Sequence, residues 1–346
     1  MNKRLPLWLP YTNKIVYTKN SVSFIYKGGE LKSRFREIQS IFFYGAVCPL
    51  EEGFLTLCSR YKIPICIHRR HMHQAIWITN SFDTNIDDVV TQQILYRRNK
   101  KKQFHIAYKL LKAKVKGMSW LIAPPDLPSY KPKNINDLRV IEAWHARKYW
   151  DEYYKRLGFS KSNRRGGADS NNIVTSALDA ISKLITGVIL RWVLYHKLSP
   201  YHGFFHITTE YPALIYDLIE PYRGYFDKVV FDTFQEKEDV SKWDGQKFIG
   251  AATNNVEAFL DKKIYTPQTQ QIVTFQELLH GSALALRAYL VKDCTRFVVP
   301  MPGKRNGGRP IKAGYKLYGR HAGFTDFQKS INEEIEEIDH ERLWYG

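Results

Sequence analysis

The sequence lacks the short motifs that identify several common classes of enzyme. It contains no GxxxxGK[ST] phosphate-binding loop, so nucleotide hydrolysis is unsupported, and it contains no GxSxG nucleophile elbow. Its four cysteines form no CxxC pair and have no histidines at zinc-site spacing, so we expect reduced structural thiols. They are Cys48, Cys58, Cys66 and Cys294.

Long apolar runs are also missing from the chain. No segment approaches the roughly 18 consecutive apolar residues of a membrane-spanning helix. The first six residues, MNKRLP, lack the apolar core of a signal peptide. We therefore expect an intracellular protein with no membrane partner.

Acidic residues are scarce, and their distribution is uneven. The chain has 52 Lys and Arg against 34 Asp and Glu, a formal charge of +18. A field of this sign attracts polyanions such as nucleic acid. Residues 1–130 hold 21 basic and 8 acidic side chains, whereas residues 201–250 hold 5 and 9. Basic surface around an acidic region suits an enzyme that holds a phosphate backbone while its carboxylates bind metal ions.

Length and residue patterning predict an α+β protein with two domains. At 346 residues the chain exceeds the usual size of a single domain. Short β-branched or aromatic runs fill the first eighty or so residues, and helical periodicity follows. We predict a small β-rich N-terminal domain over residues 1–85 and a larger all-helical domain over residues 86–346. The predicted strands are 14–17, 21–26, 38–43, 63–67 and 75–78, with one short helix at 51–61.

The helical part begins with a strongly basic segment. Residues 87–120 predict one or two helices, with nine Lys or Arg from Arg97 to Lys116 and no acid between Asp88 and Asp126. We predict that this basic segment contacts the DNA backbone, although a solvated helix face has the same pattern. Four prolines in residues 124–132 predict a loop, because proline disrupts helices. Further helices are predicted at 136–157, 171–195, 213–226 and 274–289.

Two more basic segments and an acidic end lie outside these helices. Arg164 and Arg165 belong to a glycine-containing loop, 163–167, which either holds phosphates or is a mobile surface loop. Residues 295–325 contain basic side chains and no acid, which predicts an exposed basic arm. The acidic C-terminal end, residues 333–339, is either a helix or a tail.

Candidate metal ligands come from three separate segments. Glu142 belongs to the predicted helix 136–157, and His206 follows an apolar Gly-Phe-Phe run. Asp217 and Glu220 are three residues apart and so share one helix face. One imidazole with two or three carboxylates suits a hard divalent cation that acts on phosphate. The alternatives are a salt-bridged glutamate, a core histidine, and pairing of the two later acids with Arg223.

The most specific pattern spans the histidine and the last two acids. It reads P-Y-x-G-F-x-H over residues 200–206 and then D-L-x-E-P-x-R over residues 217–223. A β-rich N-terminal unit, the helix of Glu142, and Asn172 in a connecting helix precede it. From about residue 14 to residue 232, this order resembles the CRISPR-associated spacer-acquisition integrases, the Cas1 family.

The resemblance implies a function and a set of site residues. Glu142, His206 and Glu220 would ligate Mg²⁺ or Mn²⁺, and Asp217 would be a neighbouring catalytic acid. The helical domain would be catalytic, in a metal-dependent DNA integrase and endonuclease. Such an enzyme inserts short spacer DNA into a CRISPR array, by attack of a DNA 3′ hydroxyl on a phosphodiester. We further predict Arg164, Arg165 and Arg223 as DNA-binding residues.

The resemblance also implies partners and a location. These are double-stranded spacer-precursor and repeat DNA, a second copy in a homodimer, a dimer of the small Cas2 protein, and the cytoplasm of a prokaryote. Two alternative functions remain open. One is a non-catalytic architectural protein that binds DNA and uses the same acids in buried salt bridges. The other is a stand-alone nuclease of branched DNA.

Overall fold

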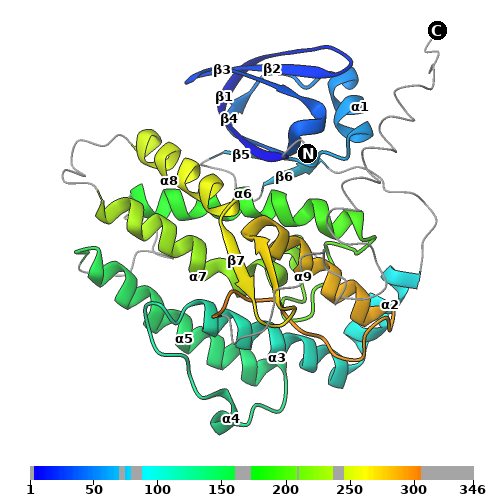
Figure 1. The fold of residues 1–346 in the computed structure, drawn as a ribbon, viewed down its shortest axis with the longest axis vertical. Helices are drawn as coiled ribbons and strands as arrows, with labels where there is room; N and C mark the ends of the chain where they lie inside the picture. Colours follow the sequence, from blue (N-terminus) through cyan, green and yellow to red (C-terminus); the bar gives the residue numbers. More distant parts are fainter. Residues whose placement is uncertain are drawn as a thin grey trace.

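The computed structural model describes residues 4–69, 75–78, 88–159, 173–208, 210–236 and 245–304. A β-sheet with one short helix forms one end of the molecule, and helices form the rest (Figure 1). The predicted α+β class, with a β-rich part before a helical part, is confirmed. The helical part also contains an unpredicted hairpin of β7 (Lys263–Thr266) and β8 (Gln271–Thr274). The predicted domain boundary, between residues 85 and 86, lies outside the described residues.

The N-terminal sheet has six strands in the order β3-β2-β1-β4-β5-β6. Its elements are β1 (Leu5–Tyr17), β2 (Ser21–Tyr26), β3 (Gly29–Arg34), the 3₁₀ turn η1 (Phe35–Glu37), β4 (Ile38–Val47), α1 (Glu52–Arg60), β5 (Ile65–His68) and β6 (Ile76–Ile78). Strand β4 pairs in parallel with β1 and β5, and the other neighbours are antiparallel. Strand β1 is longer than the predicted strand 14–17, since it begins at Leu5, and Pro6 and Pro10 lie in its first half. That half pairs with β4 before β2 joins at Thr12, and proline is tolerated in such an edge position.

The helices follow the predicted order with two differences. They are α2 (Asp88–Arg98), α3 (Lys100–Gly117), α4 (Leu127–Tyr130), α5 (Ile135–Arg156), α6 (Ile173–Tyr195), α7 (Ala213–Gln235), α8 (Gly245–Leu260) and α9 (Phe275–Leu290). Helix α8 was not predicted. The prediction that prolines exclude helix from residues 124–132 is wrong, because α4 forms there. Pro128 lies in its first turn, where a missing backbone N–H removes no helical hydrogen bond.

Helix α6 lies at the centre of the molecule and joins the sheet to the other helices. One hydrophobic core extends from the sheet through α6 to α9. Gly187 of α6 packs closely on β4, since an added Cβ would lie 3.1 Å from Ser40 Oγ. The buried Arg191 donates to the carbonyl oxygens of Gln39 and Lys62 at 3.1 and 2.9 Å. By length and composition α6 could cross a membrane, but 72% of its apolar window is buried inside the protein, as in many core helices.

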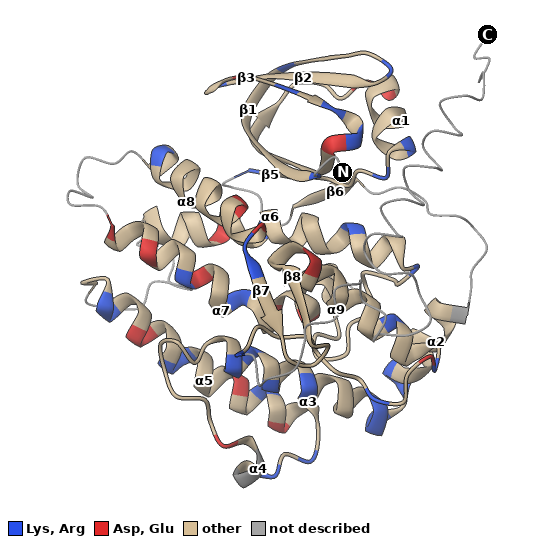
Figure 2. Cartoon of the chain, viewed as in Figure 1, with Lys and Arg blue, Asp and Glu red and all other residues tan. Residues whose placement is uncertain are grey.

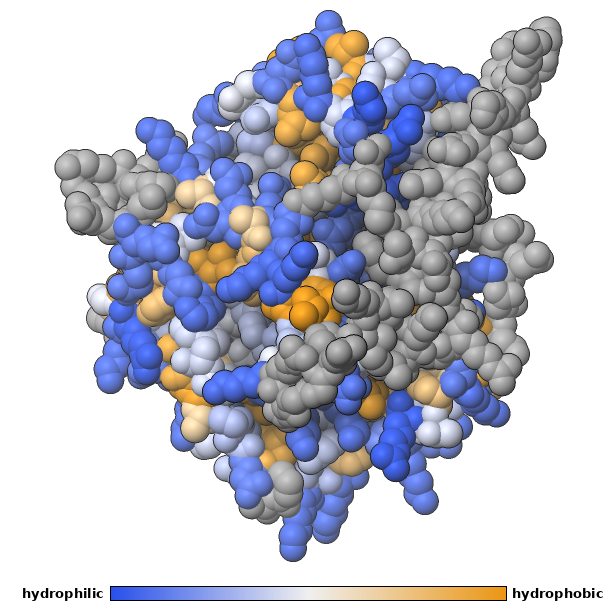
Figure 3. All heavy atoms as spheres, viewed as in Figure 1, coloured by the Kyte–Doolittle hydropathy of each residue, from blue (hydrophilic) through white to orange (hydrophobic). Residues whose placement is uncertain are grey.

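The charged surface follows the predicted basic segment. Lys and Arg recur along α2 and α3 in Figure 2. Six of them are exposed: Arg98, Lys100, Lys101, Lys102, Lys112 and Lys116. Hydrophilic side chains dominate the described part of the face in Figure 3, with smaller apolar patches between them.

The four cysteines are free thiols, as predicted. Cys58 and Cys66 are buried in the N-terminal sheet region, and burial raises the pKa of both thiols. They therefore act as small apolar core residues rather than as nucleophiles.

Candidate active site

Helices α3 and α7 cross almost backbone to backbone, and this crossing positions the candidate site. A Cβ added at Gly117 of α3 would lie 2.5 Å from the carbonyl oxygen of Pro221, and one added at Gly224 of α7 would lie 2.5 Å from the carbonyl oxygen of Gly117. Glycine is the residue that permits so close an approach of two backbones. The crossing brings Lys114, one turn before Gly117, into contact with Glu220, one turn before Gly224.

The histidine loop, residues 199–207, is part of the connection between α6 and α7 and is held by side chains from α2, α3 and α5. Gln93 donates to the carbonyl oxygens of Ser199 and His202 and accepts the Ser199 N–H. Three further donors bind loop carbonyls on both sides of His206: Gln103 binds that of Phe204 at 3.0 Å, Arg139 that of Phe205 at 3.3 Å, and Arg97 that of Ile207 at 2.5 Å. Because these carbonyls are satisfied one by one, the backbone around His206 has a defined position.

Asp217 holds the same loop from the side of α7. Its side chain is fully buried and accepts the backbone N–H groups of Phe204, Phe205 and His206 at 2.5, 3.0 and 2.9 Å. It also pairs with Nδ1 of His206 at 2.7 Å. Since a carboxylate accepts hydrogen bonds, Nδ1 carries the hydrogen, and Nε2 of the neutral ring is left as the free acceptor. Asp217 therefore orients the imidazole.

The charge of Asp217 also changes the titration of this histidine. Burial lowers the pKa of His206, but the hydrogen bond and charge of Asp217, with the charge of Glu220, outweigh burial. The pKa of the imidazole is therefore raised above its usual value.

Two glutamates and two cations form a buried ion cluster beside the imidazole. Lys114 Nζ lies 2.5 Å from Glu142 Oε1 of α5 and 2.6 Å from Glu220 Oε2 of α7. Arg223 Nη1 donates to the other oxygen of Glu220 at 2.9 Å. Burial raises the pKa of Glu220, but the charges of Arg223, Lys114 and His206 outweigh it and lower that pKa to about 2. Burial likewise lowers the pKa of Lys114, yet the two glutamates raise it overall.

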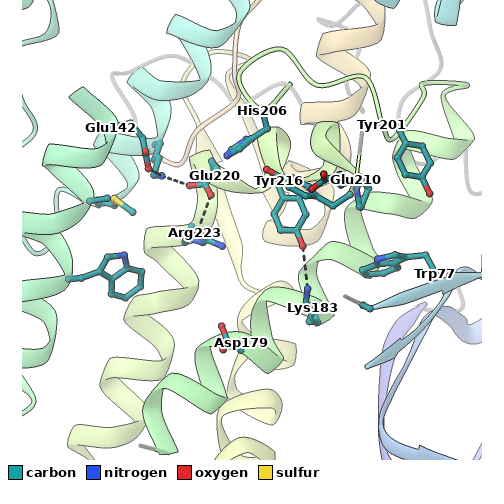
Figure 4. Close-up of a pocket in the computed structure, with 17 residues that line it drawn as sticks. Trp77, Glu142, Asp179, Lys183, Tyr201, His206, Glu210, Tyr216, Glu220 and Arg223 are labelled. Carbon is teal, nitrogen blue, oxygen red and sulfur yellow. Dashed lines mark hydrogen bonds and ion pairs between the residues drawn. The ribbon is translucent and has the colours of Figure 1, made fainter. Parts of the chain in front are cut away.

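These groups line a cavity of about 630 Å³ between the helices and the N-terminal sheet. Glu142, His206, Glu220 and Arg223 form one wall, with His206 beside Glu220 (Figure 4). Across the cavity, Lys183 of α6 donates to the hydroxyl of Tyr216 at 3.3 Å. Trp77 of β6 forms the sheet side (Figure 4). Lys183, Tyr216 and Trp77 thus line the cavity opposite the carboxylates, together with two further acids, Asp179 and Glu210.

The structure brings most of the predicted site residues together. Glu142, His206, Glu220 and Arg223 share the cavity, and Asp217 lies directly behind His206. Arg164 and Arg165 lie outside the described residues. In the part of the chain that is described, no three His, Cys, Asp or Glu side chains are arranged to hold a metal ion. The ammonium of Lys114 lies between two of the three predicted ligands instead.

Lys114 is the site residue that sequence reasoning missed. It was grouped with the basic segment predicted to contact DNA, but its side chain is only 6% exposed and pairs with acids of the same chain. That grouping is wrong for Lys114. A signal was present in the sequence, because Lys114 continues the buried stripe of Ala107, Leu110 and Leu111 at helical spacing. A lysine on an apolar stripe requires a buried partner.

Solved structures with the same fold include three of direct interest. A casposase bound to its integration product has a TM-score of 0.71 and 16% identity, and the match covers 96% of this chain and 99% of that chain. A Cas1 protein from Thermotoga maritima has a TM-score of 0.69 and 16% identity, with 87% and 99% covered. A chain from a Cas6-RT-Cas1–Cas2 complex has a TM-score of 0.69 and 12% identity, with 88% and 37% covered. At these identities the likeness establishes the fold.

Family membership is established by sequence. No curated protein matches the chain. The sequence model of the family described as "CRISPR associated protein Cas1" matches residues 10–247, which is more than half of the chain and includes the motif of the histidine loop and α7. The chain therefore belongs to the Cas1 family of CRISPR-associated proteins.

Proposed function

We propose that this protein is a metal-dependent DNA integrase of CRISPR adaptation, with endonuclease capacity. The observation that carries the proposal is the convergence of Glu142, His206 and Glu220, from three segments of a family member, on one cavity. The casposase with the same fold is bound to an integration product, which is consistent with strand joining. In this reaction a DNA 3′ hydroxyl attacks a phosphodiester, and one phosphate ester bond replaces another.

The side chains present fit a resident Mg²⁺ or Mn²⁺ ion in their chemistry. Carboxylate oxygens and a neutral imidazole are ligands that these ions accept. Glu142, His206 and Glu220 would hold the ion, at a place where the protein already stabilises a positive charge, the ammonium of Lys114. When bound, the ion would activate the attacking hydroxyl and neutralise charge that develops on the phosphate.

The remaining residues of the site orient the histidine ring or would bind DNA phosphates. Asp217 fixes the ring of His206 so that Nε2 is the acceptor. Arg223 forms an ion pair with Glu220 and also lines the cavity, where it would bind a DNA phosphate. We propose the same role for Arg164 and Arg165. The exposed cations of α2 and α3 would hold the duplex backbone outside the cavity. Charge neutralisation and positioning therefore carry the reaction, without ATP.

The wider assembly is part of the same proposal. We propose that residues 1–85 form a dimerisation and DNA-contact domain and that residues 86–346 form the catalytic domain. Two copies would form a homodimer that binds a dimer of Cas2, with spacer-precursor and repeat DNA as substrates, in the cytoplasm of a prokaryote. A complex that contains Cas1 and Cas2 has a chain with this fold, which supports the Cas2 part of the proposal.

The direct test is a strand-joining assay. The purified protein, with its Cas2 partner, Mg²⁺ or Mn²⁺, a short duplex and a supercoiled plasmid carrying the array, should give joined products. His206→Ala should abolish joining, whereas His105→Ala, at an exposed position of α3, should leave it intact. Joining at the wild-type rate by His206→Ala would refute the site assignment.

The architectural alternative has one observation in its favour. Glu220 forms a buried ion pair with Lys114, and Glu142 forms a partly buried one, much as that alternative requires. Calorimetry with Mn²⁺ separates the two functions, because an architectural protein would bind DNA with a steep salt dependence but would show no Mn²⁺ binding. Heat of Mn²⁺ binding that disappears in Glu220→Gln would favour the integrase. The branched-DNA nuclease keeps the metal site, and it would cleave branched substrates without an array.

A further inference from the structure

Lys114 occupies the place where the proposed metal ion would bind. Its ammonium contacts Glu142 at 2.5 Å and Glu220 at 2.6 Å, and these are the two carboxylates proposed as ligands. The side chain of Lys114 is 6% exposed, and those of Glu142 and Glu220 are 21% and 8% exposed. Water therefore screens this contact little, and the ammonium neutralises both carboxylates, with Arg223 as a second cation on Glu220.

The same carboxylate oxygens cannot bind both cations in one geometry. Mg²⁺ binds its ligand atoms at about 2.1 Å and gives up its waters reluctantly, so it needs carboxylate oxygens that no other cation occupies. An ammonium between the two glutamates blocks the approach of an ion to both, and it also repels a second positive charge at that short distance. Binding of the ion therefore requires that Nζ leave at least one of the two carboxylates.

The helix backbone near Lys114 is tightly packed, so the lysine side chain is the part that can move. One turn away, α3 and α7 pack backbone to backbone at Gly117 and Gly224, so a shift of the helix would break this packing, whereas a change of side-chain rotamer would not. The lysine side chain has four rotatable bonds, and Lys114 lines the cavity, so its ammonium has space on that side. Arg223 retains one oxygen of Glu220 and keeps that carboxylate in place during the exchange.

We propose that Lys114 is a positioning residue that holds Glu142 and Glu220 ready for the metal ion and competes with the ion for them. This inference rests on the proposed metal-dependent function. In the metal-free protein the ammonium neutralises the buried Glu220 and the partly buried Glu142, which would otherwise repel each other. When the ion binds, the ammonium is displaced into the cavity. Metal affinity is thereby set by an exchange of cations rather than by filling of an open site.

Calorimetry with Mn²⁺ on the full-length chain tests this exchange. Lys114→Met keeps an unbranched side chain, shorter by the terminal ammonium, and removes the charge, so Mn²⁺ should bind roughly tenfold or more tightly. The thermal midpoint without metal should fall, and its rise on saturation with Mn²⁺ should exceed that of the wild type. Lys114→Arg, which keeps the charge, should bind Mn²⁺ no better than the wild type. Lys112→Met, at an exposed position of the same helix, should match the wild type.

A second measurement uses the wild-type protein alone and so does not depend on the folding of a variant. Amine acetylation followed by mass spectrometry should leave Lys114 unmodified in the presence of a chelator and modify it with saturating Mn²⁺. Lys112 should be modified equally in both conditions. Unchanged labelling of Lys114, or Mn²⁺ affinity in Lys114→Met at or below the wild-type value, would overturn the exchange alone. Absence of Mn²⁺ binding by the wild type would overturn the proposed metal site as well.

Discussion

Replacement of Asp217 by asparagine tests whether one buried carboxylate holds the histidine loop. Its Oδ2 accepts the N–H groups of Phe204 and Phe205, and its Oδ1 accepts the N–H of His206 and pairs with the Nδ1 of that residue. Asparagine has one acceptor oxygen, and its NH₂ group would face two N–H donors that it cannot bind. A buried donor left unsatisfied costs about 1–3 kcal/mol, so two of them cost at least about 2 kcal/mol, and about 3 kcal/mol if each costs about 1.5 kcal/mol.

Hydrogen exchange of the loop measures this loss where it occurs. The backbone amides of residues 204–206 are the donors to Asp217, so a peptide that contains them reports the free energy of local opening. A loss of about 3 kcal/mol should speed their exchange by roughly a hundredfold, at about 1.4 kcal/mol per factor of ten. Mn²⁺ affinity should fall in parallel, because the imidazole loses the partner that orients it.

The matched control lies farther along the same helix. Asp232 is half exposed and pairs with Lys228 one turn away, so Asp232→Asn should leave the exchange of the loop unchanged. If the three loop amides of Asp217→Asn exchanged within about threefold of the wild-type rate, the change in opening free energy would be below about 1 kcal/mol. The carboxylate would then not be what holds the loop.

Two further predictions concern the pH dependence of the site and the crossing of α3 with α7. Although burial raises it, the charge of Arg223 and of neighbouring cations lowers the pKa of Glu220 from 4.5 to about 2. This contributes about 3 kcal/mol of stability above pH 4.5 that is lost as the pH falls toward 2, so urea unfolding of the metal-free wild type and of Glu220→Gln should converge there. Gly224→Ala would press on the carbonyl of Gly117 and should cost about 1–3 kcal/mol in urea unfolding and weaken Mn²⁺ binding. Gly250→Ala, in α8 with open space around the added Cβ, should instead be neutral or stabilise by up to about 1 kcal/mol.

Elements with a clear residue pattern of their own could be predicted from the sequence. Elements that depend on packing against distant parts of the chain could not. Helices α5, α6, α7 and α9 have apolar stripes that recur at helical spacing, and their order followed from that pattern. Helix α8 contains Gly250 and paired asparagines, which are weak helix formers, and its stability comes from packing of Phe248, Ala252 and Val256. Strand β1 extends N-terminal to the predicted strand 14–17, through Pro6 and Pro10, because proline is tolerated where a strand has a single neighbour.

In the candidate site, too, neighbours in the sequence could be predicted and contacts between distant segments could not. The motif of the histidine loop and α7 contains Asp217, Glu220 and Arg223 at fixed spacing, so their proximity could be predicted. Lys114 lies beside Glu142 and Glu220 because α3, α5 and α7, which are far apart in sequence, pack together. No local sequence pattern encodes that packing. What the sequence did contain was a lysine on an apolar stripe, which required an acid without identifying it.

Asp217 and Glu220 are chemically alike and three residues apart, yet the partners of each decide which can release its oxygens to a metal ion. Both oxygens of Asp217 are bound by backbone N–H groups and by the ring of His206. A metal ion could take those oxygens only if the loop itself opened. The partners of Glu220 are two cations on side chains, and one cation can replace another without disturbance of the backbone. Glu220 is therefore the carboxylate of α7 that we propose as a ligand, and Asp217 acts through His206.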